Sequence, residues 1–345
     1  MTEEEKYMQR ALDLATLGRG LVAPNPLVGC VVVADGEIIG EGWHKKYGEA
    51  HAEVNAVNAV ENKQQLQKAT VYVTLEPCAH FGKTPPCADL LCSLPVRKVF
   101  ISTSDPNPLV AGKGIEKLKK AGVEVKTGIL EQSGKALNKR FFTFIEKQRP
   151  YIILKWAETA DGFIAKEDFS SKWISNELSR TLVHKWRSEE AAVLVGRNTV
   201  LQDNPLLTVR NWTGRNPRAI ILDPTLRLSP NHAIFNTPAE VLIYNQVKNY
   251  TRGNNIFIKL ENNLPCIPEV LKNLFERKIQ SVIVEGGAGV LKSFIACGLW
   301  DEIRRFKSKE SFYTGIPAPE FKGELINRES LREDILDIFH PVHKI

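Results

Sequence analysis

This sequence has few of the features that mark secreted, membrane-spanning or polyanion-binding proteins. Its 345 residues include only six cysteines, which do not make the disulfide framework of a small secreted protein. No run of 18 apolar residues occurs, and the first residues are acidic where a secretory signal would be basic and then apolar. We therefore expect a cytoplasmic protein with no membrane partner.

Concentrated positive charge is also missing. The net charge of +6 is small for this length, and no run of lysine and arginine marks a stripe that would follow a nucleic-acid backbone. This balance argues against nucleic acid as the partner and favours a small molecule. With 43% hydrophobic and 25% charged residues the composition is that of a globular protein, and the length predicts two domains.

Three potential zinc ligands and one carboxylate stand out between residues 51 and 87. Glu53 follows His51 by two positions, and eight residues separate Cys78 from Cys87. This order of histidine, glutamate and two cysteines is typical of zinc-dependent nucleobase deaminases, although their cysteines are usually only two residues apart. We predict that His51, Cys78 and Cys87 bind Zn²⁺.

The chemistry of deamination explains why these residue types occur together. Three protein ligands leave a fourth zinc position open for a water molecule, whose pKa falls to about 7. Glu53 is predicted to be the catalytic residue that takes the proton of this water and returns it to the substrate. A closed structural zinc site with His80 as the fourth ligand is the alternative, and it would leave Glu53 without a role.

Local signals place these residues at the starts of helices. Residues 52–60 are predicted to form a helix that opens at His51, and Pro85 and Pro86 are expected in the first turn of a helix that carries Cys87. A helix N-terminus favours thiolate over thiol. Taken alone, each residue has a structural alternative to zinc binding: His51 as an ordinary capping histidine, and Cys78 and Cys87 as buried cysteines.

Strands and helices alternate through the first part of the chain, which predicts a layered α/β/α sandwich with its site where strands end and helices begin. The expected helices cover residues 7–17, 52–60, 87–93 and 115–121, and the expected strands cover residues 28–34, 37–40, 70–74, 96–102 and 123–127. Three phenylalanines in residues 131–147 are expected to cover apolar surface between domains. We place the two domains at residues 1–147 and 148–345.

Four segments of the first domain resemble one known family. Residues 24–29 (PNPLVG), 51–53 (HAE), 76–87 (EPCAHFGKTPPC) and 105–108 (DPNP) are similar to the deaminase half of the bifunctional deaminase-reductases of riboflavin biosynthesis, which also have the eight-residue spacing between the cysteines. The resemblance covers the chain nearly end to end. It implies an α/β fold with a cytidine-deaminase-like first domain and a dihydrofolate-reductase-like second domain.

The resemblance implies hydrolytic deamination of 2,5-diamino-6-(5-phosphoribosylamino)pyrimidin-4(3H)-one to 5-amino-6-(5-phosphoribosylamino)uracil. The substrate-binding residues that it implies in this domain are Asn25, His80, Lys83, Asp105 and Asn107. A lysine suits a phosphate dianion, and amides and carboxylates suit the edge of a pyrimidine. Turn chemistry beside proline is the alternative for Asn25 and Asn107, and a solvated surface position is the alternative for Lys83.

Two segments of the second half carry a binding mechanism of their own. Apolar strands predicted at residues 192–195 and 281–284 run into glycine-containing turns at residues 196–199 and 285–289. Such turns expose backbone N–H groups to a phosphate, which fits a dinucleotide, and tight packing of the turn is the alternative. Residues 155–162 (KWAETADG) are similar to the opening of dihydrofolate-reductase-like reductases.

For this second domain the resemblance implies an NADPH-dependent reduction of the ribosyl group to ribityl. The implied NADPH contacts are Ala157, Trp173, Thr199, Asp203, Gly287, Ala288, Gly289, Val290, Leu291, Lys292 and Ser293. The implied substrate contacts are Ser171, Arg187, Leu207, Arg210 and Glu285. The two arginines suit a phosphate because guanidinium binds it bidentately, and a surface ion pair is their alternative. Lys155 and Glu285 are predicted to be catalytic beside the reacting ribose carbon, where a carboxylate stabilises a protonated nitrogen.

The chain departs from the family pattern in two places. Arg197 occupies a turn where a small residue is expected, and it either touches the extra phosphate of the cofactor or faces water. Residues 301–309 (DEIRRFKSK) replace an apolar strand and a following Ala-Pro. This replacement leaves open the position of the last strands and the contacts of the homo-oligomer that we expect.

Three other functions compete with this interpretation. The first is a deaminase with a degenerate reductase domain, and the second is a deaminase of bases in tRNA or single-stranded DNA, which needs basic and aromatic residues around its pocket. The third is a regulatory protein with a dead site, which predicts the loss of Glu53 or of one zinc ligand. None of these residues is missing from the sequence.

Overall fold

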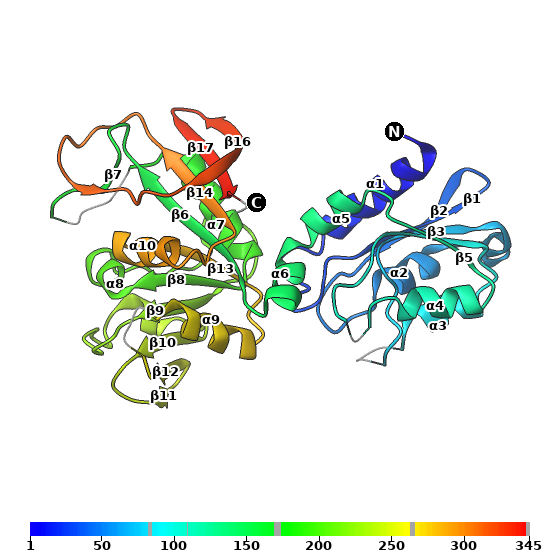
Figure 1. Ribbon diagram of the computed structural model, residues 1–345, viewed down its shortest axis with the longest axis horizontal. Coiled ribbons are helices and arrows are strands. Elements are labelled where there is room, and N and C mark those ends of the chain that lie inside the picture. Colours follow the sequence, from blue (N-terminus) through cyan, green and yellow to red (C-terminus); the bar gives the residue numbers. More distant parts are fainter. Residues whose placement is uncertain (82–84, 109, 169–173, 263–265, 343–345) are drawn as a thin grey trace. The chain divides into compact units, whose positions relative to one another are not determined.

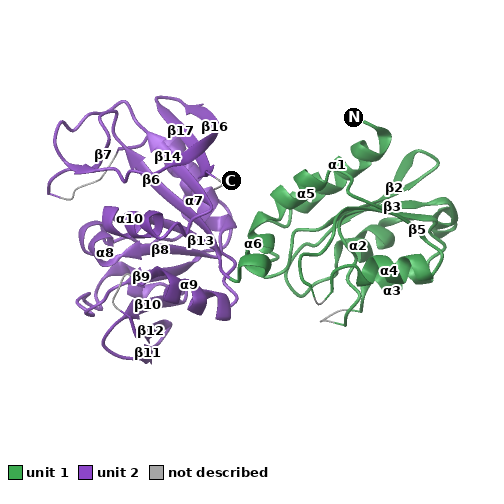
Figure 2. Cartoon of the chain, in the orientation of Figure 1, with its two compact units in different colours: residues 1–148 green, residues 149–345 purple. Residues whose placement is uncertain are grey.

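Two β-sheets organise the chain, and each belongs to its own unit (Figure 2). The computed structural model describes residues 1–81, 85–108, 110–168, 174–262 and 266–342. The units comprise residues 1–148 and 149–345, so the division falls one residue beyond the boundary drawn from the sequence. In the described ranges, every helix is too short or too polar to cross a membrane.

The sheet of unit 1 has five strands in the order β2-β1-β3-β4-β5. The strands are β1 (Gly29–Ala34), β2 (Glu37–Trp43), β3 (Thr70–Leu75), β4 (Lys98–Thr103) and β5 (Glu124–Thr127). β1 is antiparallel to both of its neighbours, whereas β3, β4 and β5 are parallel. The turn between β1 and β2 has positive φ at Asp35 (51°) and Gly36 (83°), as a two-residue Asp-Gly hairpin requires.

Helices cover both faces of this sheet (Figure 1), which confirms the predicted α/β/α sandwich. The helices are α1 (Glu3–Thr16), α2 (Ala52–Ala59), α3 (Cys87–Ser93), α4 (Lys113–Lys120), α5 (Glu131–Leu137) and α6 (Lys139–Lys147), with a 3-10 helix η1 at Lys63–Lys68. α1 buries Met8 and Leu12 against Val31 and Phe100 of one face. On the other face, α2, α3 and α4 pack against the alternate side chains of β1, β3 and β4.

One local expectation for unit 1 was wrong, and one feature was not predicted. Pro85 and Pro86 precede α3 instead of forming its first turn, because Pro86 has an extended backbone (φ −61°, ψ 133°) and the helix begins at Cys87. The phenylalanine-rich segment is divided at Asn138, which is buried and exchanges two 2.8 Å hydrogen bonds with the backbone of Leu27. These bonds tie the start of α6 to the segment that carries Asn25.

The sheet of unit 2 has ten strands in the order β11-β12-β10-β9-β8-β13-β6-β14-β17-β16. Its strands are β6 (Tyr151–Glu158), β8 (Ala192–Gly196), β9 (Arg218–Leu222), β10 (Val241–Asn245), β11 (Tyr250–Arg252), β12 (Asn255–Lys259), β13 (Ser281–Gly286), β14 (Glu302–Lys307), β16 (Gly323–Leu331) and β17 (Asp334–Pro341). Along this sheet, every pair of neighbours from β12 across to β14 is parallel. The outer strands β11, β17 and β16 pair antiparallel with their neighbours. β7 (Phe163–Ala165) and β15 (Ile316–Pro317) form a separate pair.

Helices also cover both faces of the second sheet (Figure 1). α9 (Ile267–Glu276) and α10 (Ala288–Ala296) bury apolar side chains with one face, and α7 (Glu177–Glu189) and α8 (Arg197–Asp203) do so with the other. A 3-10 helix η2 covers Ala233–Asn236. Because most of the sheet is parallel, the carboxyl ends of β6, β8 and β13 lie at one edge, where ligands of α/β proteins usually bind.

The charged segment at residues 301–309 keeps a strand position, since β14 lies between β6 and β17. The buried charges of this segment are paired inside the unit. Asp301 accepts hydrogen bonds of 2.5 and 2.8 Å from Arg149, and Arg304 donates to Glu302 over 2.5 Å. A buried charge is tolerated when it is paired in this way, so the departure from the family pattern changes the chemistry of the strand and leaves its place in the sheet intact.

Candidate active sites

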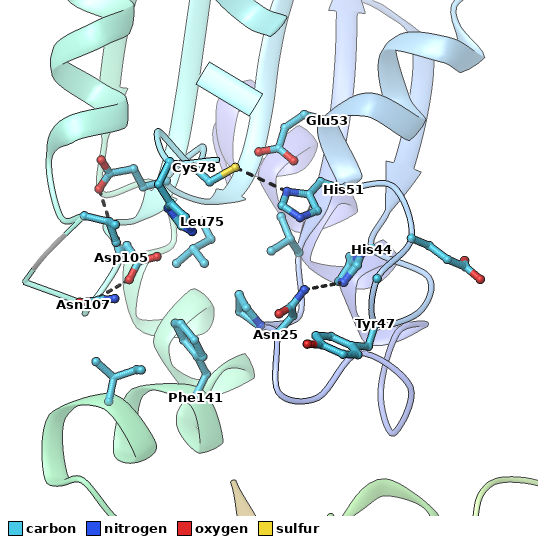
Figure 3. Close-up of a pocket in the computed structure, with 18 residues that line it drawn as sticks. Asn25, His44, Tyr47, His51, Glu53, Leu75, Cys78, Asp105, Asn107 and Phe141 are labelled. Atoms are coloured by element: carbon cyan, nitrogen blue, oxygen red, sulfur yellow. Dashed lines mark hydrogen bonds between the residues drawn. The ribbon is translucent and has the colours of Figure 1, made fainter. Parts of the chain in front are cut away.

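The three predicted metal ligands converge in unit 1. Figure 3 shows two of them, His51 and Cys78, side by side. His51 is the N-cap of α2, Cys78 follows β3, and Cys87 is the first residue of α3. Their ligand atoms all lie within 4.8 Å of one another. The Nδ1 atom of His51 is 3.6 Å from the sulfur of Cys78 and 3.3 Å from that of Cys87. The ends of two helices and one strand therefore build the site.

This donor set fits zinc, which prefers nitrogen and sulfur ligands in a tetrahedral arrangement. Among the residues that the structure describes, the group has three members, and His80 is exposed and outside it. Three ligands match an open catalytic site better than a closed structural one. A hydrogen bond from the Cys87 thiol, and a weaker one from His51, lower the pKa of Cys78 below that of an ordinary thiol, which favours the thiolate at this sulfur.

Glu53 lies beside the ligands in the first turn of α2, with its carboxylate near Cys78 and His51 in Figure 3. The side chain is buried and lines a cavity of about 510 Å³ together with His51 and Cys78. Burial, followed by the negative charge of Cys78, raises the pKa of Glu53 to about 6. A carboxylate with a pKa this close to neutral can both accept and return a proton.

Four of the five predicted substrate residues of unit 1 line the same cavity. These residues are Asn25, His80, Asp105 and Asn107, whereas Lys83 lies outside the described residues. Asp105 accepts a 2.8 Å hydrogen bond from the backbone of Asn107, so the turn interpretation also holds for this loop. The loop thus combines turn chemistry with two polar side chains on the cavity wall.

Asn25 owes its orientation to His44, which the sequence analysis did not single out. The Nδ1 atom of His44 is 3.1 Å from the carbonyl oxygen of Ala50, which can only accept, so Nδ1 carries a proton. Burial lowers the pKa of His44, and its neutral Nε2 atom accepts from the Asn25 amide nitrogen over 3.1 Å. The amide oxygen of Asn25 therefore points away from His44.

Tyr47, Glu49 and Phe141 also line this cavity and were missed. Phe141 comes from α6, which is far in the sequence from the metal ligands, and its role as a wall residue was hidden among neighbouring phenylalanines. Of those neighbours, Phe142 and Phe144 are buried. These phenylalanines have no fixed spacing from a motif, so the sequence does not indicate which of the three lines the cavity.

The second candidate site is a cavity of about 480 Å³ in unit 2. Most of the predicted residues line it, namely Lys155, Ala157, Arg187, Thr199, Asp203, Leu207, Arg210, Glu285, Gly287, Ala288, Gly289 and Leu291. Of the described residues in the predicted set, Val290, Lys292 and Ser293 are outside the lining. Ser171 and Trp173 lie outside the described residues.

A buried ion pair forms one wall of the second cavity. Glu285 accepts two 2.7 Å hydrogen bonds from Arg187, and the two side chains are 6% and 12% exposed. Burial alone would raise the pKa of Glu285, but Arg187 and then Lys155 lower it to about 2. Burial lowers the pKa of Lys155, and Glu285 opposes this effect. The arginine is therefore paired in the interior instead of on the surface.

The glycine-rich turns fit both expected roles of their glycines, which are tight packing of the turn and close approach of the backbone to a phosphate. A Cβ atom on Gly196 would lie 2.8 Å from Val290 and one on Gly286 would lie 2.8 Å from Thr199, so tight packing requires glycine at these positions. Gly287 has φ of 76°, which favours glycine, and it lies on the cavity wall ahead of α10. Gly287 is therefore the better candidate for close approach to a phosphate.

Further residues of the second cavity were missed. Arg180, His184, Asn198 and Gln202 line it. The spacing of Arg180, His184 and Arg187 along α7 places them on one face of this helix. The sequence analysis predicted no helix here, so this signal went unused. Arg197, which the sequence left open, donates a 3.0 Å hydrogen bond to Thr225.

Two family models match the chain. Residues 1–103 match the cytidine and deoxycytidylate deaminase zinc-binding region, and residues 150–307 match the RibD C-terminal domain. The riboflavin biosynthesis protein RibD of Aquifex aeolicus is 44% identical over 308 residues, which cover 87% of this chain and 85% of that protein. The RibD of Bacillus amyloliquefaciens is 45% identical over 309 residues, covering 87% and 83%.

Solved structures agree with these matches. A diaminohydroxyphosphoribosylaminopyrimidine deaminase/5-amino-6-(5-phosphoribosylamino)uracil reductase from Thermotoga maritima is 39% identical, with a TM-score of 0.92 and coverage of 99% of each chain. A RibD structure from Acinetobacter baumannii is 35% identical, with a TM-score of 0.91 and coverage of 99% of each chain. The predicted fold of both halves, cytidine-deaminase-like and then reductase-like, is confirmed.

Proposed function

Because this chain belongs to the RibD family of riboflavin biosynthesis proteins, which join a deaminase to a reductase, we propose that it catalyses two consecutive steps on one pyrimidine. Unit 1 removes an amino group from 2,5-diamino-6-(5-phosphoribosylamino)pyrimidin-4(3H)-one, and unit 2 reduces the ribosyl group of the resulting uracil. The observation that carries the proposal is the open group of His51, Cys78 and Cys87 beside buried Glu53.

In unit 1, His51, Cys78 and Cys87 would hold the zinc ion. Zinc bound there would lower the pKa of a water molecule, so that hydroxide would be available at neutral pH to attack an aromatic carbon. Glu53 accepts the proton of the attacking water and delivers it to the leaving amine, for which its pKa of about 6 is suited. The position of Glu53 in the first turn of α2 holds the carboxylate beside the ligands throughout.

The pyrimidine is held by polar groups from opposite walls of the cavity. Asn25, whose nitrogen is bound to His44, offers its amide oxygen to an amino or ring N–H group. Asp105 and Asn107 approach from the loop after β4, and Phe141 supplies an aromatic wall (Figure 3). A small cavity with several directed polar groups suits a single base and explains the lack of a basic surface stripe.

In unit 2, NADPH would lie along the carboxyl ends of β6, β8 and β13, near Ala157, Thr199 and the turn at Gly287. NADPH supplies the hydride. Lys155 and Glu285 flank the reacting carbon, and the ionised carboxylate of Glu285 stabilises positive charge on the imine nitrogen of the substrate. Arg187 is engaged by Glu285, so Arg210 is the residue that we assign to the substrate phosphate.

The assembly and location of the protein follow from other features. β16 is the edge strand of the ten-stranded sheet, and nearly all of its nine residues are exposed. An exposed edge can add the same strand of a second copy, which supports a homo-oligomer. None of the six cysteines, all of which are among the described residues, forms a disulfide, which suits the reducing cytoplasm.

The deaminase assignment is tested by ammonia release and zinc content in the wild type, Glu53→Gln and Glu61→Gln. Glu61 is an exposed glutamate just beyond α2, so its variant is the matched control. We expect Glu53→Gln to keep its zinc and to lose ammonia release by a factor of about 10² to 10⁴, with the control unaffected. Ammonia release at the wild-type rate by Glu53→Gln would exclude the assigned role.

The reductase assignment is tested by NADPH oxidation with purified 5-amino-6-(5-phosphoribosylamino)uracil. A degenerate reductase domain remains the second candidate for unit 2 because β14 carries charges where an apolar strand was expected. Oxidation of NADPH that depends on this intermediate would support the two-step enzyme. If the intermediate promotes no oxidation of NADPH, unit 2 is a degenerate reductase domain and the chain has deaminase activity only.

A further inference from the structure

Glu76 stands in the zinc-binding segment, yet neither the metal nor proton transfer requires it. Its side chain is buried and accepts four backbone hydrogen bonds. The Oε2 atom accepts from the N–H groups of Asp105 (3.3 Å) and Gly112 (3.0 Å). The Oε1 atom accepts from the N–H groups of Gly114 (3.0 Å) and Ile115 (3.3 Å). The Glu76 carboxylate therefore binds the backbone at both ends of the segment that runs from Asp105 to the first turn of α4.

The same segment is packed against the backbone that leads to the metal. A Cβ atom on Gly114 would lie 2.0 Å from the carbonyl oxygen of Pro77, a separation that no side chain allows. Pro77 joins Glu76 to Cys78 in the chain, and the backbone N–H of Glu76 donates to the carbonyl of Thr103 at the end of β4 (3.0 Å). The start of α4 and the zinc-binding segment thus touch without an intervening side chain.

Only a carboxylate fits this arrangement well. Four N–H groups converge on two oxygens, and hydrogen bonds to an ionised acceptor are shorter and stronger than those between neutral groups. An amide would offer one oxygen to two of the donors and would turn its own N–H₂ group toward the other two. The preference for glutamate at this position is therefore electrostatic and geometric at once.

We propose that Glu76 is a positioning residue that couples the zinc-binding segment to the substrate-binding loop of Asp105 and Asn107. This inference rests on the proposed function, in which that loop holds the pyrimidine. Glu76 fixes the backbone of Asp105, and the Asp105 side chain in turn accepts from the N–H of Asn107 (2.8 Å). The distance between the pyrimidine edge and the metal is set through Glu76, which is outside the group of zinc ligands and whose two carboxylate oxygens are held by backbone N–H groups.

The test compares Glu76→Gln with Glu116→Gln in the full-length zinc enzyme. Glu116 lies on the exposed side of α4 in an i,i+4 pair with Lys120, so its variant changes the same charge without touching the loop. For Glu76→Gln we expect KM for the diaminopyrimidinone to rise about tenfold or more, with a smaller change in kcat. Zinc content and NADPH oxidation by unit 2 stay at wild-type values, and the control variant behaves as wild type.

A purely structural role would give a different pattern. Partial unfolding of unit 1 would lower kcat and zinc content together, because fewer molecules are active, and would leave KM unchanged. A second variant, Gly114→Ala, pushes the start of α4 away from Pro77 with no change of charge, and we expect the same rise in KM. An unchanged KM in both variants would overturn the proposal.

Asp105→Asn separates this inference from the proposed function beneath it. A raised KM in Asp105→Asn with an unchanged KM in Glu76→Gln would reject the coupling through Glu76 and keep the substrate-binding role of the loop. If Asp105→Asn also leaves KM unchanged, the loop does not bind the pyrimidine, and both conclusions fail.

Discussion

Arg187 of α7 and Glu285 at the end of β13 hold each other through two hydrogen bonds of 2.7 Å. The pair lies on the wall of the reductase cavity, and Lys155 of β6 is close enough to help keep Glu285 ionised. Glu285 therefore cannot act as a proton donor near neutral pH. Its fixed negative charge is available to stabilise a cationic intermediate without any rearrangement of the site.

Removal of one member of this pair should be costly. We expect Arg187→Met to lower the free energy of unfolding of unit 2 by about 3 to 5 kcal/mol, because Glu285 would remain buried without its partner. Urea unfolding followed by tryptophan fluorescence measures the change. The matched control is Arg218→Met, whose pair with Glu240 is exposed and should contribute less than about 1 kcal/mol. Equal losses in the two variants would contradict the buried-pair interpretation.

The stability of unit 2 should also depend on pH through Glu285. Its pKa is about 2 in the folded protein against 4.5 for an ordinary glutamate. A lowered folded-state pKa contributes stability above the unfolded value, and this contribution is lost as the pH falls toward the folded value. The difference in unfolding free energy between wild type and Glu285→Gln should therefore be constant above about pH 5 and shrink as the pH decreases toward 3. A difference that grows on acidification would refute the shift.

Lys155 should matter for hydride transfer more than for cofactor binding. We expect Lys155→Met to reduce kcat for NADPH oxidation by a factor of about 10² or more, with the Kd for NADPH changed far less. The reason is that burial holds Lys155 against the cavity beside Glu285. Lys185→Met is the control, because Lys185 belongs to the same unit but stacks on Trp212 outside the cavity. Equal kcat in the two variants would remove Lys155 from the mechanism.

The metal site was the part of this protein most open to prediction. Ligand chemistry restricts zinc sites to a few residue types, and the strand and helix signals around His51 and Cys87 were sufficient to place the ligands at element ends. The exact start of α3 was not predictable, because proline is tolerated both in a first turn and just before it. His44 and Phe141 reach the cavity through tertiary packing, which has no local signature.

In unit 2 the sequence predicted the wall residues better than their partners. The turns after β8 and β13 were visible as glycines between apolar strands and helices. The pairing of Arg187 with Glu285 was not, because 98 residues separate the two side chains in the chain. From the sequence alone, Arg187 was predicted as a substrate contact, and its pairing with Glu285 adds a second partner that the sequence did not indicate. The place of the charged segment at residues 301–309 stayed open for the same reason, since Arg149 and Asp337, the partners of Asp301 and Arg305, lie far away in the sequence.

One measurement tests the two-site account most directly. The wild-type enzyme is given the diaminopyrimidinone and NADPH, and ammonia release and NADPH oxidation are followed in one sample before and after zinc chelation. We predict that chelation stops both signals with this substrate, whereas NADPH oxidation continues when purified 5-amino-6-(5-phosphoribosylamino)uracil is supplied. Undiminished ammonia release from fully zinc-free enzyme would contradict the central claim that His51, Cys78 and Cys87 form the deaminase centre.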